Sequence, residues 1–229
     1  MKKSGGNFRT TKQKMKTAKG RKISSTLWLE RQLNDPYVQQ ARRDGYHSRA
    51  AYKLLEADEK HKFLRPGLVA IDLGAAPGSW SQILVNVVKP EKSGGIVVAI
   101  DLLPIKKVKD ITFIQGDFLD MEMQKKLIAE TGGRKADIIV SDLAPQTLGN
   151  SSADHLRIMG LAEEALMFCK DLLKDGGSFF IKIFQGGDEK KYVDELKSLF
   201  SEVKYLKPKA SRQDSKEIYV FCRGFGKKR

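Results

Sequence analysis

The sequence has very few cysteines and no long apolar run. Cys169 and Cys222 are the only cysteines among 229 residues, and neither lies in a CxxC pair or a histidine-containing ligand spacing. We therefore expect neither a disulfide framework nor a metal site. The apolar runs are far shorter than the ~20 residues of a membrane-spanning helix. The lysine-rich start lacks the apolar segment of a secretory signal, so we expect a cytoplasmic protein that does not bind membranes.

Acidic residues are scarce relative to basic ones. The chain has 42 Lys and Arg against 28 Asp and Glu, a formal net charge of +14, and its first acid is Glu30. An excess of this sign favours a polyanionic partner such as RNA. Residues 1–25 have too few apolar side chains to offset the entropy of ordering, so we expect a disordered basic arm there. The arm is either a solvated tail or an RNA contact.

A single domain is expected over residues 26–229, which are enough to bury one core. Its helical lead-in, residues 26–62, should face RNA, and residues 63–229 should form a doubly wound α/β core. Apolar strands that alternate with amphipathic helices are typical of a parallel sheet covered on both faces. We expect helices at residues 28–33, 48–60, 79–88, 121–130, 154–173 and 189–200, and strands at 68–73, 96–100, 111–114, 137–141, 178–184, 203–206 and 217–222.

The last two predicted strands break this alternation. Residues 203–206 and 217–222 are joined by a segment too short for a right-handed helical crossover, so we expect an antiparallel hairpin. The last strand would then start at the sheet edge where the parallel strands end.

A glycine-rich turn follows the first predicted strand. Residues 72–80 run from a buried strand through this turn into a helix, as a nucleotide-type site at a strand end requires. The turn is not G-x-G-x-x-G, and its proline removes one amide, which disfavours a dinucleotide and hence a nicotinamide-dependent dehydrogenase. Asp101 and Asp117 end the next two strands, where carboxylates can accept from the ribose hydroxyls and the adenine amino group of S-adenosylmethionine.

Charged residues also mark three other strands. Lys182 lies inside an apolar strand, where an unpaired ammonium is costly. Asp142 ends the neighbouring strand and Glu217 begins the antiparallel one, so these charges should meet at one sheet edge. Lys53, on the basic helix before the sheet, can add a second cation. Such a cluster is either a structural group of ion pairs or a catalytic site.

Several segments together resemble the FtsJ (RrmJ) family of ribose 2′-O-methyltransferases, closest to bacterial members that methylate a uridine of 23S rRNA. The resemblance implies a Rossmann-like S-adenosylmethionine-dependent methyltransferase fold and extends from Trp28 to the end. At residues 213–214 the chain departs from the family, which is more basic there. The matching segments are residues 48–54, 72–82, 101–104, 116–118, 141–145, 182–186 and 211–212 with 217–219.

The resemblance also implies roles for individual residues. By resemblance, Lys53, Asp142, Lys182 and Glu217 form a Lys-Asp-Lys-Glu catalytic tetrad, and Gly78, Trp80, Asp101, Asp117 and Asp142 contact S-adenosylmethionine. We expect Lys182 to accept the proton of a ribose 2′-hydroxyl while the two carboxylates orient the amines.

The predicted function is S-adenosylmethionine-dependent methylation of a ribose 2′-hydroxyl in a uridine of 23S rRNA, within the large ribosomal subunit. We expect a monomer that needs no metal. Two alternatives remain: a tRNA ribose 2′-O-methyltransferase, and a catalytically silent RNA-binding ribosome-assembly factor. The side chains expected to contact RNA are Arg42, Arg43, Arg49, Lys53, Lys207, Lys209 and Arg212.

Overall fold

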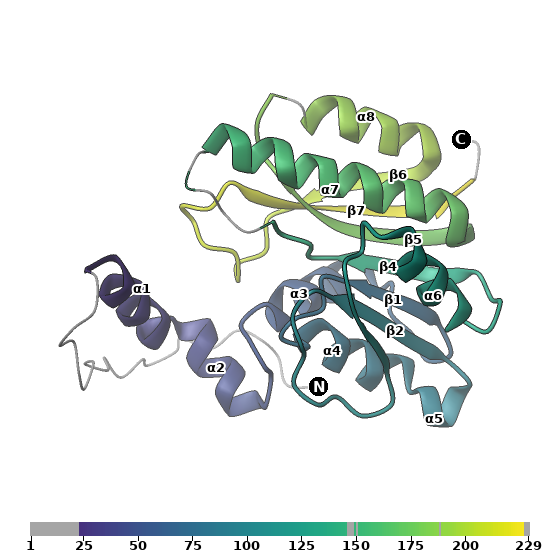
Figure 1. The fold of residues 1–229 in the computed structure, drawn as a ribbon, viewed down its shortest axis with the longest axis horizontal. Helices are drawn as coiled ribbons and strands as arrows, with labels where there is room; N and C mark the ends of the chain where they lie inside the picture. The colour runs from purple at the N-terminus through teal and green to yellow at the C-terminus, as the bar shows by residue number, and fades with distance from the viewer. Residues whose placement is uncertain (1–22, 146–148, 150, 188, 227–229) are drawn as a thin grey trace.

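The computed structural model describes residues 23–145, 149, 151–187 and 189–226. Most of the arm predicted for residues 1–25 lies outside these ranges, and residues 23–25 form the start of the first helix. The helices are α1 (Ile23–Asn34), α2 (Pro36–Asp44), α3 (Ala51–His61), α4 (Ser79–Val88), α5 (Pro90–Ser93), α6 (Met121–Ala129), α7 (Ser151–Leu172) and α8 (Glu189–Leu199) (Figure 1). The strands are β1 (Val69–Leu73), β2 (Ile96–Asp101), β3 (Thr112–Gln115), β4 (Ala136–Ser141), β5 (Leu173–Phe184), β6 (Phe200–Leu206) and β7 (Glu217–Phe225).

The seven strands form one sheet in the order β3-β2-β1-β4-β5-β7-β6. Strands β1 to β5 pair in parallel, whereas β7 is antiparallel to both β5 and β6. This arrangement confirms the predicted doubly wound α/β fold and the predicted terminal hairpin. Because β7 runs against its neighbour, Phe184 near the end of β5 pairs with Glu217 at the start of β7.

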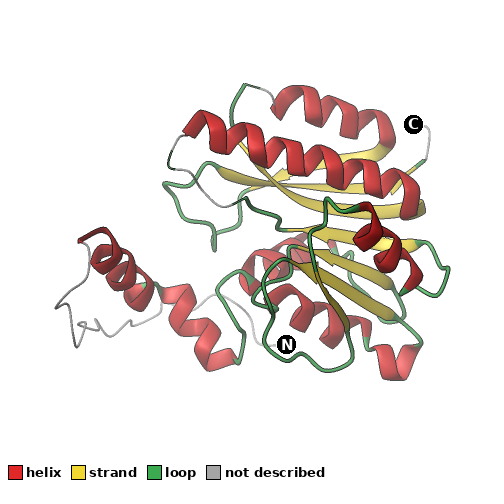
Figure 2. Cartoon of the chain, viewed as in Figure 1, coloured by secondary structure: helices red, strands yellow, loops and turns green. Residues whose placement is uncertain are grey.

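The core consists of two apolar clusters, one on each face of the sheet. Successive side chains of a strand point to opposite faces, and β1 accordingly gives Ile71 to one cluster and Ala70 to the other. The first cluster includes Leu127, Phe168 and Leu196 of α6, α7 and α8, while the second includes residues of α3 and α4. Figure 2 shows these helices on both sides of the strands. Among the described residues, every helix is too short or too polar to span a bilayer.

The lead-in contains a helix that the sequence pattern did not predict. Helix α2 has few apolar residues, and its ends are fixed locally instead: Asp35 Oδ1 accepts from Tyr37 N at 2.9 Å, and Gly45 ends the helix with φ of 80°. Helix α1 is also longer than the predicted residues 28–33. Together α1 and α2 project from the body of the domain (Figure 1).

Candidate active site

The structure brings the four charged side chains of the predicted tetrad together at one edge of the sheet. Lys182 Nζ lies 2.8 Å from Asp142 Oδ1 and 2.7 Å from the Asp142 backbone oxygen. On the other side, Lys53 Nζ lies 2.9 Å from Glu217 Oε1. The two lysines are buried, with exposed fractions of 9% for Lys53 and 7% for Lys182. The topology explains this meeting, because β4, β5 and β7 are adjacent and α3 packs on α4 beside them.

A tyrosine that the sequence reasoning assigned no role joins the two halves of this tetrad. The hydroxyl of Tyr219 donates to Asp142 Oδ1 at 2.8 Å and accepts from Lys53 Nζ at 2.9 Å. Its ring is fully buried and stacks on Phe180, with centroids 5.1 Å apart. Strand periodicity could have indicated that Tyr219 lies at the site, since it follows Glu217 by two residues and is therefore on the same face of β7. The result is one continuous chain of polar contacts from Glu217 to Lys182.

The electrostatics of the site favour an ionised Asp142. Burial raises the pKa of its carboxyl, but the ammonium groups of Lys182 and Lys53, with hydrogen bonds from Lys182 and Tyr219, outweigh burial and hold the pKa below its usual value. The pKa of Tyr219 is raised well above its usual value, first by burial and then by the charges of Asp142 and Glu217. Tyr219 therefore keeps its proton and acts as a hydrogen-bond bridge at neutral pH.

The glycine-rich turn after β1 lies directly beside Asp142. Gly74 has φ of 80°, and a Cβ there would lie 2.7 Å from the backbone nitrogen of Leu143. The Asp142 amide in turn donates to Leu73 O at 3.0 Å. Only glycine permits this approach, because a side chain would meet backbone that cannot move aside. Gly78 caps α4 with φ of 104° and packs against His47, where a Cβ would lie 3.0 Å from Nδ1.

Asp72 places a buried carboxylate beneath this turn. It is completely buried at the end of β1, and Ser81 Oγ donates to its Oδ2 at 2.7 Å. Within the described residues, its Oδ1 has no hydrogen-bond partner. Burial is the main cause that raises the pKa of Asp72 to about 7; the hydrogen bonds from Ser81 oppose this rise, and the charges of Asp142 and Asp101 add to it. An unpartnered buried acceptor next to a glycine turn is the kind of group that a bound cation or amine satisfies.

The other predicted cofactor residues lie around the same turn. Asp101 accepts from the amides of Ala76 and Leu103, both at 2.8 Å, which holds its carboxylate at the end of β2. Asp117 is exposed after β3, the strand paired with β2. The Trp80 side chain faces the core: it is 3% exposed, and its Nε1 donates to a backbone oxygen of the lead-in, Ala50 O, at 2.8 Å. Only the backbone of Trp80, in the first turn of α4, can therefore contact a ligand of the turn.

The segment before α3 holds the glycine turn from outside. His47 Nδ1 lies 2.9 Å from Pro77 O, and because that carbonyl only accepts, Nδ1 carries the proton. The His47 amide donates to Gln82 Oε1 at 2.9 Å, and Ser48 Oγ lies 2.7 Å from Ser79 Oγ. Because His47 stands in a polar stretch of sequence outside any motif, this role could not be predicted from the sequence. These contacts join the lead-in to the glycine turn.

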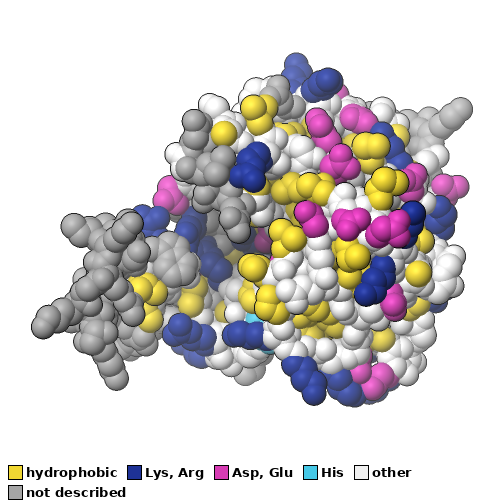
Figure 3. All heavy atoms as spheres, viewed as in Figure 1, with side chains coloured by type: hydrophobic (Ala, Val, Ile, Leu, Met, Phe, Trp, Pro, Cys, Tyr) yellow, Lys and Arg dark blue, Asp and Glu magenta, His cyan; other side chains and the backbone are white. Residues whose placement is uncertain are grey.

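Most of the predicted RNA-contacting side chains lie on the lead-in and on the loop before β7. Arg42 and Arg43 are exposed on α2, and Lys209 is exposed on the loop. Lys207 is engaged by the loop itself, with Nζ 2.7 Å from Ser215 O. Figure 3 shows dark-blue Lys and Arg side chains where the projecting helices meet the body. No cluster of three or more His, Cys, Asp or Glu side chains in the described ranges is arranged to hold a metal ion.

Sequence comparison identifies the family. The FtsJ-like methyltransferase family matches residues 46–225. The chain belongs to this family. It is 53% identical over 222 residues to the "Ribosomal RNA large subunit methyltransferase E" of Rhodopseudomonas palustris (strain BisA53), covering 97% of this chain and 93% of that protein. The protein of the same name from Paramagnetospirillum magneticum (strain ATCC 700264 / AMB-1) is 51% identical over 223 residues, 96% and 91% of the two chains.

Solved structures show the same fold. A crystal structure of a protein named as a ribosomal RNA methyltransferase from Plasmodium falciparum superposes with a TM-score of 0.70 at 31% identity, covering 79% of this chain and 98% of that one. The fibrillarin/Nop5p complex contains a chain of the same fold, with a TM-score of 0.51 and 18% identity, covering 71% and 75%. The Rossmann-like methyltransferase fold implied by the sequence resemblance is thereby confirmed.

Proposed function

We propose that this FtsJ-like methyltransferase transfers a methyl group from S-adenosylmethionine to a ribose 2′-hydroxyl of RNA. The observation that carries the proposal is the contact between the glycine turn and the tetrad: Gly74 packs on the backbone at Leu143, next to Asp142. A cofactor in the turn would lie beside the tetrad, within reach of a substrate held by the lysines. A ribosome-assembly factor without catalysis would have no use for two lysines buried in this way.

The residues around the turn fit S-adenosylmethionine. Carboxylates of Asp101 and Asp117 lie at the ends of β2 and β3, where ribose hydroxyls and an adenine amino group can donate to them. The unpartnered Oδ1 of Asp72 suits the positively charged methionine end. Gly78 and the amide of Trp80 offer backbone contacts. When bound, the cofactor supplies a methyl group on a sulfonium, which is activated for transfer to a nucleophile.

The tetrad would prepare that nucleophile. A ribose 2′-hydroxyl is a poor nucleophile until its proton is removed. We assign this step to Lys182, which acts as general base in the neutral amine form, after its own proton has passed to solvent. Asp142 fixes Lys182 through its carboxylate and its backbone oxygen. Glu217 fixes Lys53, whose positive charge is placed to stabilise the oxygen as it loses its proton. Proximity supplies much of the remaining acceleration, because both reactants are held at one sheet edge.

The substrate that the relatives favour is ribosomal RNA. Two relatives that share at least 91% of their length with this chain are named methyltransferases of large-subunit ribosomal RNA. We extend this to a uridine of 23S rRNA in the large ribosomal subunit. The net charge of +14 and the basic lead-in support a polyanionic substrate of this size.

Substitutions at Lys182 test the proposed role. Lys182→Ala should leave S-adenosylmethionine affinity, measured by calorimetry, within about twofold of wild type while methyl transfer falls by about 10²-fold or more. Lys182→Arg keeps a cation for Asp142 but cannot act as a base, because a guanidinium does not lose its proton, so it should also be inactive. Lys174 is the matched control. It lies on β5 like Lys182 but near the opposite end of this strand, where it pairs with Asp137 of β4. Near-normal turnover of Lys182→Ala or Lys182→Arg would refute Lys182 as the base.

A further inference from the structure

The backbone oxygen of Pro77, in the glycine turn, accepts hydrogen bonds from two segments that lie far apart in sequence. His47 Nδ1, between α2 and α3, lies 2.9 Å from it. The amide of Lys106, between β2 and β3, donates to it at 3.3 Å. Three segments therefore meet at one atom: the end of the lead-in, the glycine turn and the loop that follows Asp101.

The neighbouring Gly78 has both of these segments packed against it. Its φ is 104°, and a Cβ there would lie 3.0 Å from His47 Nδ1 and 3.3 Å from Val108 Cγ2. In a close-packed region, a shift of one segment must be accommodated by the segments that touch it. The lead-in and the loop after β2 therefore cannot move independently of the glycine turn.

On the lead-in side, residues 45–50 are also attached to the first turn of α4. The side chain of Gln82 donates to Gly45 O at 3.0 Å and accepts from the His47 amide at 2.9 Å. This stretch connects α2 to α3, the two helices whose basic side chains we expect to contact RNA. RNA bound on the lead-in would therefore stabilise the segment that holds the His47 ring against the glycine turn.

On the cofactor side, Asp101 attaches the loop after β2 to the same turn. Its carboxylate accepts from the amides of Ala76, in the turn, and Leu103, in the loop, both at 2.8 Å. The bond from the Lys106 amide to Pro77 O adds a second contact between loop and turn. A ligand whose ribose donates to Asp101 would therefore stabilise the loop and the turn in this joined arrangement.

We propose that His47 is a positioning residue that couples RNA binding on the lead-in to S-adenosylmethionine binding in the glycine turn. The inference rests on the proposed function and adds a mutual dependence of the two substrates. Each substrate favours the arrangement in which the three segments meet at Pro77 O, so each raises the affinity of the protein for the other. The His47 ring transmits this effect because it links the lead-in directly to the backbone of the turn. Loss of a hydrogen bond between neutral groups corresponds to about a fivefold change in an equilibrium constant, which sets the expected size of the coupling.

The test measures how strongly each ligand affects the binding of the other. Calorimetry gives the Kd of S-adenosylhomocysteine, which cannot donate a methyl group, with and without saturating large-subunit ribosomal RNA from cells that lack the protein. Filter binding gives the Kd of that RNA with and without saturating S-adenosylhomocysteine. For the wild type, each Kd should fall by about fivefold or more when the other ligand is present. The two factors should be equal, because the coupling between two binding equilibria is reciprocal.

Substitutions of His47 assign this coupling to the bond with Pro77 O. His47→Ala removes the bond and should reduce the coupling factor to less than about twofold. His47→Asn should restore the factor, because the amide nitrogen of asparagine stands in place of Nδ1 and can donate to the same carbonyl. The factor is the decisive readout. If His47 only supported the fold, its loss would weaken the binding of one ligand equally with and without the other.

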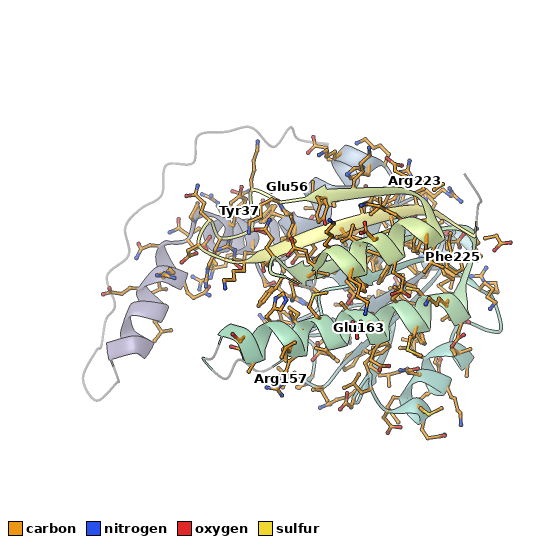
Figure 4. All side chains as sticks on the ribbon, turned by 90° about the horizontal axis from the view of Figure 1, so that it is seen from above. Tyr37, Glu56, Arg157, Glu163, Arg223 and Phe225 are labelled. Carbon is orange, nitrogen blue, oxygen red and sulfur yellow. The ribbon has the colours of Figure 1, made fainter. Side chains whose placement is uncertain are left out.

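His61→Ala is the matched control for these variants. It removes another half-buried imidazole, at the last residue of α3, where Arg223 donates to the His61 backbone oxygen. Figure 4 shows Arg223 toward the end of the domain away from Tyr37 of α2. The coupling factor of His61→Ala should therefore equal that of the wild type.

Three results would overturn the inference while leaving the proposed function intact. In the first, the two ligands bind the wild type without affecting each other. In the second, His47→Ala keeps the wild-type coupling factor, and in the third, His47→Asn loses it as His47→Ala does. Each could occur in an enzyme that methylates RNA normally. Wild-type protein that neither binds nor methylates RNA would instead overturn the proposed function, and the coupling with it.

Discussion

Replacing Tyr219 by phenylalanine removes the hydroxyl that joins the two halves of the tetrad. Two hydrogen bonds to charged partners are lost, one of 2.9 Å from Lys53 and one of 2.8 Å to Asp142. The ring itself should stay in place because it stacks on Phe180. Each charged partner keeps one other contact, so we expect the free energy of unfolding to fall by about 2 kcal/mol rather than by the full value of both bonds.

The activity of the Tyr219→Phe variant should fall more than its stability loss alone explains. Without the bridge, Lys53 and Asp142 are no longer held relative to each other, and misplaced groups of this kind lower kcat by about 10- to 100-fold. Cofactor affinity should change little, because the phenylalanine ring would stay beside Trp80, where the Tyr219 ring centroid now lies 6.0 Å away, and Asp142 keeps its ion pair with Lys182.

Tyr192→Phe provides a matched control for this variant. Tyr192 is also buried, at 3% exposure, but its hydroxyl donates to Ala162 O at 2.9 Å on the face covered by α7 and α8. Loss of this one hydrogen bond should lower the free energy of unfolding by about 1 kcal/mol and leave kcat unchanged. Chemical denaturation and single-turnover methyl transfer measure both quantities. Equal kcat values for the two variants would refute the positioning role of Tyr219.

Further predictions concern the turn and its carboxylate. The pKa of Asp72 is about 7 in the folded protein, above its usual 3.8, so the free energy of unfolding of the wild type should fall as pH rises from about 4 to 7. Asp72→Asn should remove this pH dependence. Between pH 5 and 8 the free energy of unfolding of the variant, measured by urea denaturation, should therefore rise by on the order of 2 kcal/mol relative to that of the wild type. A difference between the two proteins that stays constant with pH would contradict the raised pKa. Gly74→Ala should displace the backbone at Leu143 and reduce both cofactor affinity and turnover by about tenfold or more. Gly94→Ala, where φ is also positive at 68° but no atom lies within 4 Å of the added Cβ, should cost only about 1 kcal/mol of stability and leave both activities intact.

The positions of the charged residues could be predicted because they follow from the strand pattern. A buried strand can be recognised from its apolar composition, and the carboxyl ends of parallel strands meet at one edge of the sheet. Adding the antiparallel hairpin brings Glu217 to Asp142 and Lys182 without any knowledge of side-chain contacts. The helical spacing of residues 48–60 likewise predicted α3, which carries Lys53.

Other features depend on tertiary contacts that leave little trace in sequence. Helix α2 is stabilised by its caps rather than by an apolar stripe, so its periodicity is weak. The contact of His47 with the glycine turn joins segments 30 residues apart and follows no motif. For Trp80 the resemblance implied a cofactor contact, but only the structure shows that its indole lies in the core and hydrogen-bonds to Ala50 O. The role of Tyr219 could have been predicted from the sequence, since period-two alternation places it on the same face of β7 as Glu217.

The most direct test of the central claim is transfer of labelled methyl from S-adenosylmethionine to RNA. Total RNA and ribosomal subunits from a strain lacking the protein would be incubated with the enzyme, digested to nucleosides and separated. We expect label in 2′-O-methyluridine from large-subunit RNA, and none with the Lys182→Ala variant. Label in tRNA would contradict the substrate, label on a base would contradict the ribose 2′-hydroxyl as acceptor, and no label in any RNA would contradict the proposed activity.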